Sequence, residues 1–97
     1  MTNFCEHFVS GDEFPAPKDV CEPCIEIGDE WLHLRQCLIC FRTMCCDNSP
    51  NRHTTAHAKE TGHPFIRSAE PDEDWRYCYP HDLVYFRTDY GWEAEPS

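Results

Sequence analysis

The chain has 97 residues, of which 40% are hydrophobic, and its 8 basic and 18 acidic side chains give a net charge of −10. This length supports one domain, because either half of it would be too small to bury a core of its own. The acidic balance disfavours binding to nucleic acid or to an anionic membrane surface, since both require clusters of Lys and Arg. We expect a single domain over residues 1–92, followed by a flexible tail over residues 93–97.

The first residues carry no sign of an export signal. Residues 1–7 contain no basic segment followed by an apolar stretch, and no run approaches the roughly 18 apolar residues of a transmembrane helix. We therefore expect a cytoplasmic protein in which the eight cysteines stay reduced. A small domain with this many cysteines needs staples, and the six histidines favour metal ions over disulfides in that role.

The first half of the chain predicts little regular structure. Pro15 and Pro17 disfavour both helix and central strand, so residues 1–20 are expected to be irregular. Large apolar and polar side chains alternate over residues 31–38, which indicates a strand.

The second half predicts one helix and three further strands. The helix is expected at about residues 50–61, with Asn48 or Ser49 as N-cap, Pro50 in the first position and Gly62 as the stop. A short strand is predicted at residues 64–67, and an acidic turn at residues 70–74. A hairpin follows, formed by residues 75–79 and 83–87.

Twelve of the fourteen Cys and His residues fall in pairs whose spacing is typical of metal sites. Thiolates and imidazoles at such spacings are the ligands of a tetrahedral zinc ion. The twelve residues are Cys5/His7, Cys21/Cys24, Cys37/Cys40 and Cys78/His81, together with Cys45 and the run of His53, His57 and His63. Twelve ligands taken in fours predict three Zn²⁺ ions. The alternative is two ions, if Cys5 and His7 at one end of the chain do not form a site with Cys78 and His81 at the other.

Spacing alone leaves two assignments open. His53 and His57 lie one helical turn apart, so they can share an ion or serve two neighbouring ions. Cys46 competes with Cys45 for one position, and we expect it to be a small packed residue instead. His33 is expected to be a surface residue of the strand.

The zinc ions are expected to be structural. A catalytic zinc keeps one coordination position open for water, whereas every candidate site here can be filled by Cys and His. The predicted helix also lacks the glutamate of the His-Glu-x-x-His motif, because it runs from His53 through Thr54, Thr55 and Ala56 to His57. We therefore expect a non-enzymatic protein.

The order of these ligands resembles the ubiquitin-specific-protease-type (UBP-type) zinc finger. The phrases at residues 49–53, 61–64 and 73–75 are most similar to the small stand-alone bacterial members, and the resemblance spans residues 5 to about 86. It implies an α+β fold, a twisted antiparallel sheet with one main helix, cross-braced by the metal sites.

The resemblance also implies a ligand assignment. His53 and His57 would serve different ions, and Asp82 would be a substitute ligand for His81. The three sets implied are Cys5, His7, Cys78 and His81; Cys21, Cys24, Cys45 and His53; and Cys37, Cys40, His57 and His63.

Ubiquitin-binding members of this family capture a free C-terminal Gly-Gly tail, which implies a ubiquitin-like partner here. The matching aromatic residues are Trp75, Tyr77 and Tyr79, although aromatic side chains are equally typical of hairpin packing. The expected arginine after Cys45 is replaced by Asp47, and Arg52 is the basic residue that we expect to compensate. The binding domain is expected to be monomeric.

A second hypothesis comes from a different class of protein. Cys45 and Cys46 are adjacent thiols, and their exchange at one zinc would make the chain a thiol- or metal-responsive protein. A hydrolytic zinc enzyme ranks third, because the sequence offers neither an open coordination position nor a base.

Overall fold

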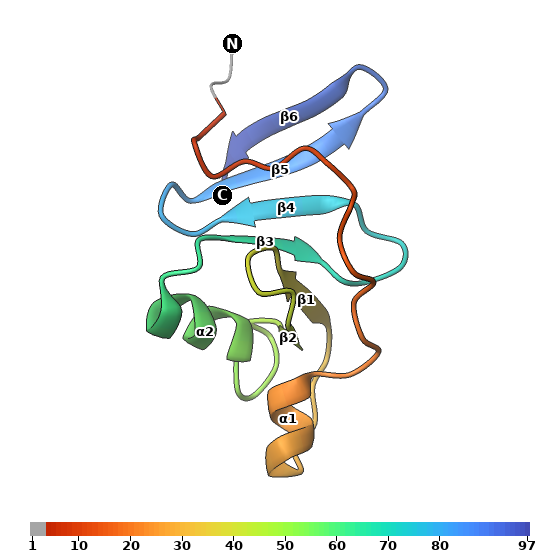
Figure 1. Ribbon diagram of the computed structural model, residues 1–97, viewed down its shortest axis with the longest axis vertical. Helices are drawn as coiled ribbons and strands as arrows, with labels where there is room; N and C mark the ends of the chain where they lie inside the picture. Colours follow the sequence, from red (N-terminus) through yellow and green to blue (C-terminus); the bar gives the residue numbers. More distant parts are fainter. Residues whose placement is uncertain (1–3) are drawn as a thin grey trace.

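A computed structural model describes residues 4–97 and places them in two helices and one six-stranded antiparallel sheet (Figure 1). The strands follow the order β2-β1-β3-β4-β5-β6 across the sheet. The elements are α1 (Glu22–Ile27), β1 (Leu34–Cys37), β2 (Thr43–Cys45), α2 (His53–Thr61), β3 (Phe65–Ser68), β4 (Trp75–Cys78), β5 (Leu83–Thr88) and β6 (Gly91–Pro96). The predicted α+β class with an antiparallel sheet is confirmed.

One face of the sheet is covered by the irregular N-terminal segment, which Figure 1 shows crossing the strands. Phe8 stacks on the buried Tyr85 at 4.5 Å between ring centroids and meets Phe65 and Trp92 edge-on. The guanidinium of Arg76 donates to the carbonyl of Val9 on this face. Residues 4–20 are irregular, as predicted, and residues 1–3 of that prediction lie outside the described residues.

Two clusters of buried residues form the core. The first surrounds Leu34 and Met44 and contains four cysteines, and the second surrounds Phe65 and Tyr85. Six of the thirteen buried hydrophobic residues are cysteines, so only seven other side chains supply the apolar packing of the core. Metal binding is the expected source of the missing stability in so small a core.

Helix α2 begins later than predicted. The sequence predicted a start at Pro50 with Asn48 or Ser49 as cap, but the helix starts at His53 and its N-cap is Arg52, in the left-handed region at φ 46°. Ser49 is unavailable as a cap, because its hydroxyl accepts the backbone N–H of Leu32 at 2.9 Å. The predicted stop at Gly62 is confirmed, with φ 75° and its N–H bonded to the carbonyl of Ala58.

The structure also contains elements that the sequence did not predict. Helix α1 and strand β2 were missed, and the strand expected over residues 31–38 is limited to β1. Strand β6 lies where a tail was expected over residues 93–97, so that expectation was wrong for Glu93–Pro96. This strand pairs with β5 from Leu83↔Pro96 to Thr88↔Gly91.

The described part of the chain has no helix that is both long enough and apolar enough to cross a membrane.

Candidate metal centre and adjoining pocket

The Cys21 group consists of Cys21, Cys24, Cys45 and His53. Helix α1 places the first two at its start, strand β2 ends at the third, and α2 begins at the fourth. The three sulfur atoms lie 3.4, 3.3 and 3.5 Å from Nδ1 of His53, and two of the sulfurs are 4.0 Å apart. Ideal tetrahedral zinc would give about 3.6 Å for a sulfur–nitrogen edge and about 3.8 Å for a sulfur–sulfur edge. The four ligand atoms therefore already have nearly the spacing of a zinc site.

The Cys37 group consists of Cys37, Cys40, His57 and His63. Its edges are 3.6 Å from Cys37 Sγ to His63 Nδ1, 3.4 Å from Cys40 Sγ to His57 Nε2, and 3.1 Å between the two imidazole nitrogens. Burial and the neighbouring His63 lower the pKa of His57, which favours the neutral imidazole that binds metal. His53 and His57 thus project from one helix into two different groups.

The Cys5 group joins the two ends of the chain and consists of Cys5, His7, Cys78 and His81. Cys78 Sγ lies 3.3 Å from His7 Nδ1 and 3.4 Å from His81 Nδ1, and these two nitrogens are 3.3 Å apart. In each of the three groups the four ligand atoms lie within 4.8 Å of one another. These are the same three sets that the resemblance implied.

Hydrogen-bond donors surround the sulfur atoms. The backbone N–H of Cys45 donates to Cys21 Sγ at 3.2 Å, and that of His53 donates to Cys45 Sγ at 3.2 Å. At the Cys5 group the buried Tyr85 hydroxyl donates to Cys5 Sγ at 2.8 Å and accepts the backbone N–H of Cys5 at 2.8 Å. Such donors stabilise thiolates and hold metal ligands in orientation.

Burial in the absence of a metal works against these thiolates. It raises the pKa of Cys21 to about 12 and that of Cys78 to about 11, and it also raises the pKa of Cys37 and Cys45. None of the eight cysteines forms a disulfide. Clustered buried thiols with nitrogen ligands at tetrahedral spacing fit a cation, which supplies the charge that thiolates need.

Three residues considered as ligands from the sequence, Cys46, His33 and Asp82, lie outside the groups. The side chain of Cys46 is buried, with its sulfur 3.5 Å from the hydroxyl of Ser49, while Cys45 occupies the group. His33 is exposed on the surface just before β1. Asp82, the substitute ligand, instead accepts the Tyr77 hydroxyl at 2.5 Å.

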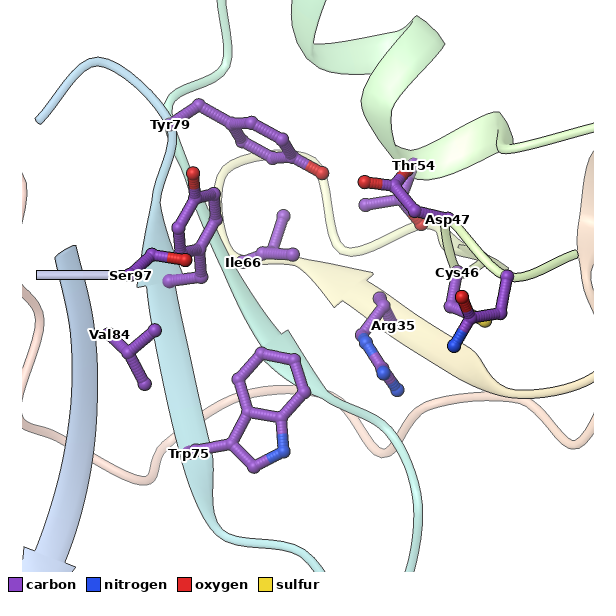
Figure 2. A pocket seen from close by; sticks show the side chains of 11 residues that line it. Arg35, Cys46, Asp47, Thr54, Ile66, Trp75, Tyr79, Val84 and Ser97 are labelled. Carbon is purple, nitrogen blue, oxygen red and sulfur yellow. The ribbon is translucent and has the colours of Figure 1, made fainter. Parts of the chain in front are cut away.

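A pocket of about 290 Å³ opens on the sheet face opposite the N-terminal segment, and its lining includes Cys46 and Thr54, which directly follow two ligands of the Cys21 group (Figure 2). In the figure Trp75 and Arg35 lie toward one end of the pocket, and Asp47 and Tyr79 toward the other. We call it the aromatic pocket, and its lining includes Arg35, Asp47, Ile66, Trp75, Tyr77 and Tyr79.

Three of the four predicted binding residues line this pocket. Tyr77 and Tyr79 meet edge-on at 4.9 Å; Trp75 and Tyr77 lie on β4, and Tyr79 directly follows this strand. Burial raises the pKa of both tyrosines, so their hydroxyls stay protonated at neutral pH. Arg52, the fourth, is exposed at the start of α2 and is not among the residues that line the pocket.

The pocket nevertheless has a cation, which sequence reasoning missed. Arg35 lies on β1, with its guanidinium 4.5 Å from the centroid of the Trp75 ring. Its Nη1 donates to the carbonyl of Leu34 at 2.9 Å and lies 3.7 Å from a carboxylate oxygen of Glu73. The available signal was its position two residues before Cys37, on the strand face that also carries that ligand.

The fold and the three Cys/His groups define a small zinc-finger domain whose metal sites interleave along the chain. The family model described as "Zn-finger in ubiquitin-hydrolases and other protein" matches residues 21–88, and the chain belongs to this family of UBP-type zinc fingers. The resemblance drawn from the sequence is therefore confirmed, and the chain is a zinc-binding module. Cys5 and His7 precede the matched residues, but the structure brings them to Cys78 and His81.

One solved structure is similar over most of the chain. It is the solution NMR structure of a protein from Rhodopseudomonas palustris, which is 41% identical, with a TM-score of 0.73, over 89% of this chain and 84% of that one. No curated protein matches the chain.

Proposed function

We propose that the protein is a non-enzymatic interaction module in which three Zn²⁺ ions, one in each Cys/His group, hold a pocket for the C-terminal tail of a partner protein. The ligand that we propose to test first is the C-terminal tail of a ubiquitin-like protein. The observation that carries the proposal is Arg35 stacked on Trp75 within a pocket whose lining also includes Tyr77 and Tyr79.

The three groups have a structural role in this proposal. Each offers four protein ligands at tetrahedral spacing, which leaves no position for a catalytic water. Their ligands come from α1, α2 and the strands β1, β2 and β4, so they fix β1 and β4, two strands that line the aromatic pocket. A structural zinc ion contributes on the order of 10 kcal/mol to the folding of such a domain.

The pocket has the parts that a peptide carboxylate requires. Nη1 of Arg35 is engaged by the carbonyl of Leu34, but its Nε and Nη2 have no hydrogen-bond partner among residues 4–97. These two groups form the planar fork that binds a carboxylate in bidentate fashion. Trp75, Tyr77 and Tyr79 line the same pocket and offer apolar surface for a narrow, extended chain end.

Peptide titration tests this function. The zinc-loaded protein is titrated calorimetrically with a short peptide ending in Gly-Gly, once with a free carboxylate and once amidated. A charged hydrogen bond is worth about 1.5–3 kcal/mol, so the free acid should bind roughly tenfold to hundredfold more tightly. Arg35→Gln should remove the preference, whereas Arg42→Gln, at a half-buried arginine that pairs with Glu26 at 3.7 Å and does not line the pocket, should keep it. Equal binding of both peptides, or binding of neither, would refute tail capture.

The number of ions has its own test. Native mass spectrometry should show three zinc ions per chain. If only two ions are bound and the Cys5 group is empty, the proposal that zinc links the two ends of the chain is wrong.

A second candidate function, zinc release through exchange of Cys45 and Cys46, is favoured by one observation. Burial acts to raise the pKa of Cys46, but hydrogen bonding to Ser49 and to backbone groups outweighs it and lowers the pKa to about 7. A thiol of this kind reacts readily with oxidants. The geometry favours the first function, because the Cys46 sulfur contacts Ser49 while Cys45 completes the metal group.

A further inference from the structure

Two opposite charges line the aromatic pocket without pairing with each other. Arg35 and Asp47 form no ion pair, and the carboxylate nearest to Arg35 in the described chain is that of Glu73, at 3.7 Å. One oxygen of Asp47 accepts the hydroxyl of Thr55 at 2.5 Å, and its other oxygen has no partner among residues 4–97. Each charge therefore keeps capacity for a ligand.

The two charges lie toward opposite ends of the pocket. The Thr55 hydroxyl that donates to Asp47 also lies 3.0 Å from the hydroxyl of Tyr79, which places Asp47 beside that aromatic wall (Figure 2). A ligand seated between Trp75 and Tyr79 consequently meets a guanidinium at one end and a carboxylate at the other.

A tail whose only charge is its terminal carboxylate can pair with Arg35 but not with Asp47. The carboxylate is attracted to Arg35, but it is repelled by Asp47, and the repulsion grows as water leaves the pocket. A ligand with a cation close to its carboxylate satisfies both walls at once. The size of the pocket, about 290 Å³, limits the ligand to the last few residues of a chain, so the cation must lie near the terminus.

The charge of the whole molecule acts in the same direction. The net charge is −10, and two further carboxylates lie close to the pocket: Glu73 accepts the indole N–H of Trp75 and Asp82 accepts the hydroxyl of Tyr77. A field of this sign raises the association rate of cationic partners and lowers that of anionic ones.

We propose that the aromatic pocket selects a protein C-terminus that has Lys or Arg within its last few residues, with the terminal carboxylate on Arg35 and the basic side chain on Asp47. This inference rests on the proposed tail binding and adds its specificity. It assigns a role to Asp47, the residue that replaces the expected arginine: its carboxylate binds a positively charged side chain of the ligand.

The test compares free-acid peptides that differ at one position. The zinc-loaded protein is titrated with short peptides ending in Gly-Gly, Gly-Lys, Lys-Gly and Glu-Gly. Of the two Lys peptides, the one that reaches Asp47 should bind about tenfold more tightly than the Gly-Gly peptide, because a charge-assisted contact is gained, and the Glu peptide should bind most weakly.

Asp47→Asn isolates the charge. The amide oxygen still accepts the Thr55 hydroxyl, so the local structure is kept while the negative charge is lost. The variant should bind Lys and Gly-Gly peptides equally. Asp89→Asn is the matched control, since Asp89 is exposed in the turn between β5 and β6 and its loss changes the net charge equally. This control should keep the Lys preference.

Each outcome separates the inference from the proposed function. Tighter binding of free-acid than of amidated peptides, with no preference for Lys, would overturn the inference and leave tail capture standing. A Lys preference that survives Asp47→Asn, or that falls equally in Asp89→Asn, would overturn it too, since net charge would then be its cause. Indifference to amidation in every peptide would overturn both.

Discussion

Tyr85→Phe removes one oxygen atom from the interior and should weaken one metal site selectively. The Tyr85 hydroxyl is fully buried, donates to Cys5 Sγ at 2.8 Å and accepts the backbone N–H of Cys5 at 2.8 Å. Phenylalanine keeps the stacking on Phe8 and the edge contact with Phe65 but provides neither hydrogen bond. The substitution therefore changes the support of the Cys5 group with little change in packing.

The size of the effect follows from those two bonds. An unsatisfied N–H costs about 1–3 kcal/mol, and loss of a hydrogen bond to a metal ligand typically lowers metal affinity about tenfold to hundredfold. The affinity of the Cys5 group for zinc should fall by this factor, equivalent to about 1.4–2.8 kcal/mol. The Cys21 and Cys37 groups should be unaffected, because Tyr85 contacts neither of them.

Chelator competition followed by native mass spectrometry measures this difference. In Tyr85→Phe the species with two zinc ions should appear at a chelator concentration about tenfold lower than in the parent protein. Imidazole NMR signals of His7 and His81 should change first as that ion leaves. Tyr90→Phe is the matched control, because Tyr90 is 100% exposed. If Tyr85→Phe loses its first ion no earlier than Tyr90→Phe, or loses it from another group, the reasoning about Tyr85 is wrong.

Two further predictions concern a cysteine outside the groups and the N-terminal segment. Cys46→Ser should keep three zinc ions and should release zinc under mild peroxide as the parent protein does. Cys45→Ser should lose one ion, because Cys45 lies in the Cys21 group and Cys46 does not. Native mass spectrometry measures the number of bound ions in each variant, before and after peroxide. Asp12→Asn should lower the free energy of unfolding of the zinc-loaded protein by about 1 kcal/mol, measured by denaturant titration at neutral pH, because Asp12 bonds the buried Arg76 at 2.9 Å and the exposed Arg87 at 2.6 Å.

These two predictions have clear contrary outcomes. Suppression of peroxide-driven zinc release in Cys46→Ser would support the thiol-responsive function instead. For Asp12, hydrogen bonding to Arg87 holds its pKa below the ordinary 3.8, so its contribution is fully present at neutral pH and is lost as the pH falls through the lowered pKa. An unchanged free energy of unfolding in Asp12→Asn, relative to Asp89→Asn, would show that this ion pair does not hold the segment to the sheet.

The metal ligands were predictable because coordination chemistry leaves a short-range signature. Pairs such as Cys21/Cys24 place two ligands on one turn, and this spacing is visible without a fold. The partition into three groups was not determined by spacing, since His53 and His57 on α2 could have shared an ion. It came from the family resemblance, and the structure brings the same three sets together.

Elements that depend on partners distant in sequence were harder to predict. Strand β6 alternates the exposed Glu93 and Glu95 with Trp92 and Ala94, but a tail was expected there because the last residues of a domain are often poorly ordered. Pairing with β5 along its whole length orders the strand. Helix α1 has only six residues, and its signal was a proline near the start and Gly28 at the stop.

The cation of the pocket was missed for a related reason. In the sequence Arg35 is only a polar position of a strand, because the family resemblance places the carboxylate-binding arginine directly after Cys45. The sheet places Arg35 opposite Ser68 on β3, and the next strand, β4, carries Trp75. Arg35 and Trp75 are 40 positions apart in the sequence, so no local spacing could predict their contact.

The interleaving of the groups also sets an order in which the protein can acquire its metal during synthesis. The Cys21 group is complete once His53 has left the ribosome, the Cys37 group once His63 has followed, and the Cys5 group only after His81. Cys5 is synthesised before every other ligand, but its group is the last to be completed, because it needs Cys78 and His81. Zinc is therefore expected to be loaded from the α1 end of the molecule toward β5, and the nascent chain remains without its end-to-end link until most of the sheet exists.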